Sequence, residues 1–349
     1  MSVPSRAQIS VTRAVVRWYF DTHRGSAGDV GVPSMFMDPA TVGPFAIDPN
    51  DFAAGAPDAL FRLLVACSMF QRLRDQQIIR TLRSMAPHHA REISSASALL
   101  KLADSSPCKF TKSTTALRER CDLTKDAAGQ GSCSVAPAVA CHLKRHTVVM
   151  KRYGHFGKVP TSIALAVREA DASDLSSLYQ QVVQAHPTRY ARAVALEAAL
   201  CAAWRVHQKI ASMFLSMVSN PDLPCGGGRS PWTRGIDWTY FVVVDSNVDL
   251  FLASIGYAGL KTYDARRSFV RELARGVSLR SFDRRLHDYN PRLVQQALFL
   301  FMSASNRIAA PDDCMRRDGS CSRCPNVLVD RCRVRRSSGQ DGTSASLEA

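Results

Sequence analysis

The sequence predicts an all-α protein, and three observations carry this prediction. Apolar residues recur at the three- and four-residue spacing of a helix face along almost all 349 residues. Alternating apolar and polar runs, which are typical of half-buried strands, are nearly absent. Hydrophobic residues make up 46% of the chain and charged residues 21%, a balance that excludes a disordered or fibrous protein and allows a large core.

The expected helices follow from this periodicity in chain order. The first is 59–85, as one long helix or two abutting ones, and the others are 138–151, 161–185, 189–218, 246–255, 263–275, 281–289 and 291–308. Segments 25–58, 105–137 and 220–237 lack periodicity and are rich in Gly, Pro or polar residues, which predicts long loops. The end of the chain, 336–349, is rich in Ser and Gly and is expected to be disordered.

The charge balance favours a polyanionic partner. Lys and Arg number 45 against 30 Asp and Glu, for a formal net charge of +15, so nucleic acid is the expected partner and an indifferent basic surface the alternative. No apolar run is long enough to span a membrane, and the N-terminus lacks the apolar stretch of a secretory signal. We therefore expect a cytoplasmic monomer. Its 11 cysteines are then expected to form no disulfides and to serve in packing, metal ligation or redox chemistry.

Four cysteines near the C-terminus form the strongest motif. They are spaced C-x6-C-x2-C-x7-C at Cys314, Cys321, Cys324 and Cys332. Four thiolates this close suit an iron-sulfur cubane or a tetrahedral zinc ion. Zinc modules more often carry two separated C-x2-C pairs, so one pair with two outlying cysteines favours a 4Fe-4S cluster, with zinc as the alternative. Seven arginines between 316 and 336 add a positive field suited to phosphates.

This order of features resembles the helix-hairpin-helix DNA glycosylases of the endonuclease III and adenine glycosylase type. In that family a two-lobed helical enzyme ends in cysteines spaced by six, two and five residues, which hold a 4Fe-4S cluster. The resemblance covers about 59–332. It implies an N-terminal helix and loop at 1–57, a core lobe with a degenerate hairpin at 58–245, and a segment 246–335 that carries the cluster loop and joins the N-terminal part in the second lobe.

The stretch VVVDSNVDLF resembles the family's catalytic V-D-T-H-V or V-D-T-N-V segment, with Asp245 at the aspartate and Asn247 two residues on. A helix pattern starts directly behind Asp245, which predicts an N-cap. The resemblance implies that its carboxylate also stabilises the positive charge that builds on a sugar as an N-glycosidic bond breaks. A plain capping aspartate is the alternative. Asn247 is expected to contact DNA.

The stretch WRVHQKIA resembles the hairpin L-P-G-V-G-x-K-x-A of the family, with Lys209 at the lysine. Bifunctional members use that lysine as an amine nucleophile. Here Arg205 and His207 replace the glycines, and we expect both to bind phosphates through their side chains. Lys209 is a nucleophile, a DNA contact or a surface residue, and a monofunctional enzyme is the preferred interpretation.

Two further sets of residues complete the predicted site. A flipped base leaves a gap that a side chain fills, and Gln71 lies near the family's glutamine for this purpose, with Arg72 and Arg74 as further wedge or phosphate contacts. Tyr153, Trp232 and Trp238 are expected in the base pocket.

With its degenerate hairpin and long loops, the chain resembles a divergent branch of the family more than its standard repair enzymes. That branch includes α-glutamyl and putrescinyl thymine pyrophosphorylases and phage-restricting glycosylases. We therefore expect a glycosylase that removes a bulky modified base from phage DNA, such as glucosylated hydroxymethylcytosine, and leaves an abasic site. The alternatives are a transferase that replaces a pyrophosphate on thymine with an amine, a base-excision repair glycosylase, and a non-catalytic DNA-binding module.

Overall fold

The computed structural model describes residues 3–25, 29–121, 123, 141–151, 154–310, 313–316 and 321–334. Within these residues the secondary structure is helical and no strand occurs, in agreement with the predicted all-α class. None of the helices in this part of the chain is both long and apolar enough to cross a membrane. Tyr153 and the tail 336–349 lie outside the described residues.

The α-helices of the described chain are joined by turns and short 3-10 segments. They are α1 (Arg6–Thr22), α2 (Pro39–Val42), α3 (Pro49–Ala54), α4 (Pro57–Met69), α5 (Asp75–Arg83), α6 (Pro87–Ile93), α7 (Ala96–Ser105), α8 (Thr114–Glu119), α9 (His142–Val149), α10 (Val159–Glu169), α11 (Leu175–Ala185), α12 (Arg189–Cys201), α13 (Gln208–Ser219), α14 (Ser246–Ser254), α15 (Tyr263–Arg275), α16 (Pro291–Met302), α17 (Ala304–Ala309) and α18 (Asn326–Val329).

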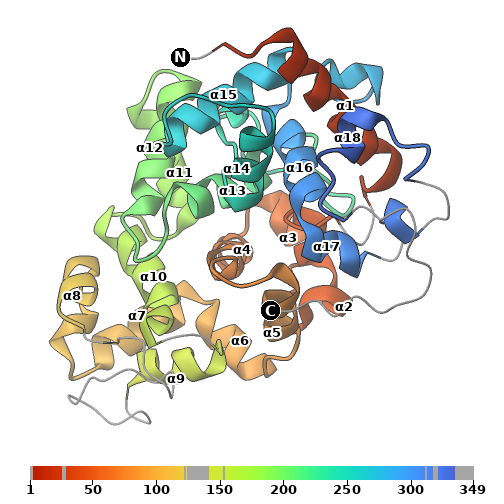
Figure 1. The fold of residues 1–349 in the computed structure, drawn as a ribbon. Helices are drawn as coiled ribbons and strands as arrows, with labels where there is room; N and C mark the ends of the chain where they lie inside the picture. The colour runs from red at the N-terminus through yellow and green to blue at the C-terminus, as the bar shows by residue number, and fades with distance from the viewer. Residues whose placement is uncertain are drawn as a thin grey trace.

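Helix α4 lies near the middle of the molecule, with α7 to α10 on one side of it and α12 to α16 on the other (Figure 1). Helix α4 carries apolar residues on nearly every face, so it is almost entirely buried and packs on α10, α11 and α13. One continuous apolar core extends from α1 through α4 to α16. A second, small core is formed by Leu117, Cys121, Leu123, Leu143 and Leu165, under α8 and α9.

Helix α1 lies beside the C-terminal helices of the described chain. Helix α1 packs on α15, α16 and α18, and its Val15, Val16 and Tyr19 are fully buried there. The first helix therefore lies with the segment that carries the four cysteines.

Several expected elements differ in the structure. Segment 189–218 is divided between α12 and α13, segment 291–308 is divided between α16 and α17, and the expected loop 105–137 contains α8. Segment 281–289 is not a helix: Asp283 accepts the Arg285 amide at 3.0 Å, and such a local side-chain bond competes with helix formation. Segment 161–185 is divided between α10 and α11, where Asp174 forms a capping box with Ser177. The expected loop 25–58 contains α2 and α3, because Phe36, Phe45 and Phe52 are buried and anchor it to the core.

Candidate active site

Asp245 lies at the junction between a buried run and helix α14. Residues 241–244 are all buried, and the chain turns into α14 directly after them. Asp245 Oδ1 accepts the backbone N–H of Asn247 at 3.0 Å and of Val248 at 2.9 Å. These bonds satisfy two amides that a helix start leaves unpaired, so the carboxylate is held in one orientation.

A small cavity of about 40 Å³ opens in front of this carboxylate. Lys209 and Asp75 line it together with Asp245, so the structure brings two of the predicted site residues and a second carboxylate to one place. Lys209 Nζ donates to the Phe70 carbonyl at 2.8 Å, and Asp75 Oδ2 accepts from Asn306 Nδ2 at 2.8 Å. The remaining walls are Val30, Gly31, Phe70, Met213, Val243, Arg292, Gln295, Gln296 and Phe299.

The charges around Asp245 oppose one another. Burial raises the pKa of Asp245, and the Asp75 carboxylate adds to this rise, while Lys209 and two backbone amides lower it. Burial also raises the pKa of Asp75. The site therefore holds a carboxylate that accepts a proton more readily than an exposed aspartate.

Lys209 stands on the second helix of a helical hairpin. Helix α12 ends at Cys201, a short turn follows, and α13 begins at Gln208. Arg205 in this turn has a φ of +65°, the left-handed conformation that normally favours glycine. The chain therefore makes a tight turn at Arg205, although the residue is not a glycine. No side chain caps the first turn of α13, and such a helix start suits an anion.

Basic side chains from three segments gather around this hairpin. Burial first, and then the charge of Arg72, lower the pKa of Arg205. The pKa of His207 is lowered by burial and then by Arg205 and Arg118. Arg118, on α8, also donates to the Ala202 carbonyl of the turn. A cluster of basic side chains of this kind favours the binding of an anion.

The floor of the cavity contains residues that the sequence reasoning missed. Arg292 is 2% exposed, and its guanidinium donates to Gln295, Gln296, Ser216 and the Gly31 carbonyl at 2.6–3.2 Å. Burial lowers the pKa of Arg292 to about 10. A signal was present: Arg292, Gln295 and Gln296 are polar residues at helical spacing in an otherwise apolar helix.

Other predicted residues lie away from the cavity wall. Gln71 Nε2 donates to the Ser68 carbonyl at 2.6 Å, so this side chain folds back on α4. Trp232 is 4% exposed and stacks on Tyr179 with ring centroids 4.6 Å apart, and it does not line the cavity. Trp238 packs edge-on against His287, also away from the cavity. Asn247 is half-buried behind Asp245, while Arg72 and Arg74 are exposed.

The four cysteines of the C-terminal motif line one cavity of about 250 Å³ against α1. Burial and then the neighbouring Cys314, Cys332 and Cys321 raise the pKa of Cys324. Arg307 donates to the sulfurs of Cys332 and Cys314 at 3.3 Å each. In the described part of the chain, no three His, Cys, Asp or Glu side chains form a group suited to one metal ion.

Comparisons of the chain with protein-family models, with curated proteins and with solved structures found no match.

Proposed function

We propose that the protein is a DNA glycosylase that hydrolyses the N-glycosidic bond of a flipped, modified base. One observation carries this proposal: the half-buried, helix-capping carboxylate of Asp245 shares a cavity with Lys209, which stands at the start of a hairpin helix. An anionic carboxylate next to a hairpin suited to phosphate is what cleavage of a nucleoside in DNA requires. The resemblance to the divergent branch favours a modified base.

In this proposal the glycosidic C–N bond breaks and its electron pair leaves with the base. The Asp245 carboxylate stabilises the positive charge on the sugar. A water oxygen then bonds to the sugar carbon, and Asp245 takes the proton that the water releases, for which its raised pKa is suited. The departing base takes up a proton from solvent. The cavity holds little more than a water molecule, so a base enters only after Phe70 or Phe299 at its wall moves.

The loop between α4 and α5 supplies the proposed DNA contacts at the cavity. Phe70 lines the cavity, and Arg72, Leu73 and Arg74 follow it as exposed residues. Leu73 is 42% exposed, and apolar side chains of this kind insert between base pairs in other DNA-bending proteins. The charge of Arg72 lowers the pKa of Arg205 in the hairpin, so two proposed phosphate contacts lie near enough to influence each other.

The cysteine cavity fits a 4Fe-4S cluster better than one zinc ion. Its volume of about 250 Å³ exceeds what a single ion needs, and all four cysteines are among its lining residues. Arg307 supplies N–H groups to two of the sulfurs, as donors around thiolate clusters commonly do. When bound to Cys314, Cys321, Cys324 and Cys332, the cluster would cross-link the C-terminal loop whose helix α18 packs on α1.

The decisive experiment incubates the purified protein with duplexes that carry ordinary, damaged or phage-modified bases. Released bases are detected by mass spectrometry, and abasic sites by alkaline cleavage. We expect Asp245→Asn to lose roughly 100- to 1000-fold in rate, because the neutral amide keeps the cap but removes the charge. Asp249→Asn is the matched control: Asp249 lies one turn later, is ion-paired with Arg266 and does not line the cavity.

The other activities give different results in the same experiment. A transferase leaves the sugar-base bond intact and changes the mass of the base within DNA. A repair glycosylase releases damaged but not phage-modified bases. A DNA-binding module releases nothing, and Asp245→Asn then changes nothing measurable.

A further inference from the structure

Tyr263, the first residue of α15, places its hydroxyl group between the two backbones of the site. The hydroxyl donates to the Val242 carbonyl at 2.8 Å and accepts from the Val244 N–H at 3.3 Å. The carbonyl of Gln208 lies 3.5 Å from the same oxygen. Val244 directly precedes Asp245, and Gln208 directly precedes Lys209. The Tyr263 hydroxyl group therefore contacts the residues that directly precede Asp245 and Lys209.

The hairpin is tied to the same helix by a second contact. Gln208 Nε2 donates to Asp264 Oδ1 at 3.1 Å, and Asp264 follows Tyr263 in the chain. The start of α15 thus contacts the start of α13 through both side chain and backbone. A displacement of α15 must move Asp245, Lys209 or both.

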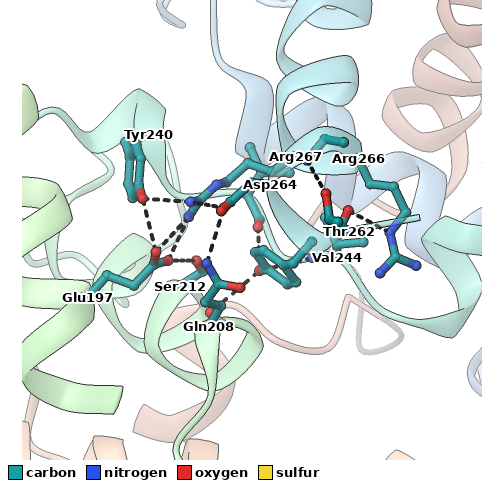
Figure 2. Close-up of polar contacts among 12 residues, drawn as sticks. Glu197, Gln208, Ser212, Tyr240, Val244, Thr262, Asp264, Arg266 and Arg267 are labelled. Atoms are coloured by element: carbon teal, nitrogen blue, oxygen red, sulfur yellow. Dashed lines mark hydrogen bonds and ion pairs between the residues drawn. The ribbon is translucent and has the colours of Figure 1, made fainter. Parts of the chain in front are cut away.

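A buried polar network holds α15 in place behind Tyr263. Figure 2 shows the side chains of Glu197, Tyr240 and Arg267 pointing toward one another. Arg267 Nη1 donates to both oxygens of Glu197 at 2.7 and 2.9 Å, and Tyr240 O–H donates to Glu197 at 3.0 Å. Ser212 of α13 donates to the same carboxylate at 2.8 Å. The network joins α12, α13 and α15, so the hydroxyl of Tyr263 has a rigid support.

We propose that Tyr263 is a positioning residue: its hydroxyl fixes the Asp245 carboxylate relative to Lys209 by holding the peptide groups before each of them. This inference rests on the proposed glycosylase function. Removing the hydroxyl leaves the Val244 N–H without this partner in a buried site, so the segment that ends at Asp245 shifts or becomes mobile. Small displacements of a catalytic group are costly to rate.

The test compares Tyr263→Phe with Tyr240→Phe. The second variant is the matched control, because Tyr240 is 5% exposed and loses two hydrogen bonds of the same network but contacts neither Val244 nor Gln208. We expect Tyr263→Phe to slow single-turnover base release roughly 10- to 100-fold while the Kd for a duplex with a tetrahydrofuran abasic analogue stays within about twofold. Tyr240→Phe should keep the rate, because Arg267 still pairs with both oxygens of Glu197 and holds α15, and it should lower the melting temperature at least as much.

Two further readouts do not depend on activity. In Tyr263→Phe, and not in Tyr240→Phe, we expect faster hydrogen exchange at the Val244 amide and a changed titration midpoint of the Asp245 carboxyl in ¹³C NMR. A wild-type rate in Tyr263→Phe, or an equal loss of rate in both variants, overturns the inference. If the wild-type protein releases no base, the proposed function fails, and unchanged exchange and titration in Tyr263→Phe then overturn the positioning role separately.

Discussion

Replacing Arg267 by methionine removes the cation of the buried ion pair that supports α15, together with its contacts to Asp264 and Tyr240. The side chains of Arg267 and Glu197 are each 6% exposed, and the guanidinium gives the carboxylate two hydrogen bonds. Arg267→Met leaves Glu197 charged and buried, with only Ser212 and Tyr240 donating to it. Methionine keeps the apolar part of the side chain, so the change acts mainly through the lost charge.

The expected cost is about 3 kcal/mol in the free energy of unfolding. Breaking a buried pair by removing one partner typically costs about 3–5 kcal/mol, and two remaining donors to Glu197 place this case at the lower end. The double variant Glu197→Gln/Arg267→Met no longer buries an unpaired charge. It should therefore be more stable than Arg267→Met alone by roughly 1 kcal/mol or more.

Urea unfolding followed by far-ultraviolet circular dichroism measures these differences. The control is Arg275→Met, on the same helix, where Arg275 and Glu272 pair at 3.1 Å with side chains 61% and 38% exposed. Such a pair contributes only about 0.2–1 kcal/mol. A loss in Arg267→Met no larger than in Arg275→Met, or a double variant less stable than the single one, would refute the reasoning about buried charge.

Four other results are expected. Base release needs ionised Asp245, and burial raises the pKa of this residue, so the rate should fall as the pH is lowered through that raised pKa. In a single-turnover pH profile, Asp75→Asn should shift this acid limb to lower pH, and a shift to higher pH contradicts the assignment. Asp245→Asn should increase the free energy of unfolding at neutral pH, because the folded state disfavours the ionised form, and the gain should vanish in acid; a gain that grows in acid contradicts this. Arg118→Ala and Arg205→Ala should each reduce the slope of log affinity against log salt by about 1 in fluorescence anisotropy, whereas unchanged slopes exclude phosphate contacts. Cys324→Ser should lose an absorbance band at about 400 nm that the 4Fe-4S cluster gives. A wild-type protein that lacks this band but contains zinc contradicts the proposal of a 4Fe-4S cluster.

Local patterns in the sequence predicted much of the helical structure. Asp245 caps α14 as expected, because a cap depends only on the residue and the amides two and three positions later. The spacing of the four cysteines predicted one metal centre, which stays a prediction, and the structure places all four along one cavity. The prediction of a helix at 281–289 was wrong. Only Leu286 and Tyr289 supply large apolar side chains after Phe282, and the Asp283 carboxylate accepts the backbone N–H of Arg285.

The sequence by itself determined the helical class, the cap at Asp245 and the thiol motif, because each depends on neighbours a few positions apart. Only the tertiary structure decided that Asp75 and Arg292 border the same cavity, that Arg205 adopts a left-handed turn, and that Tyr263 joins the two backbones of the site. These features depend on how helices far apart in the chain pack, and packing is set by the whole core rather than by any local pattern.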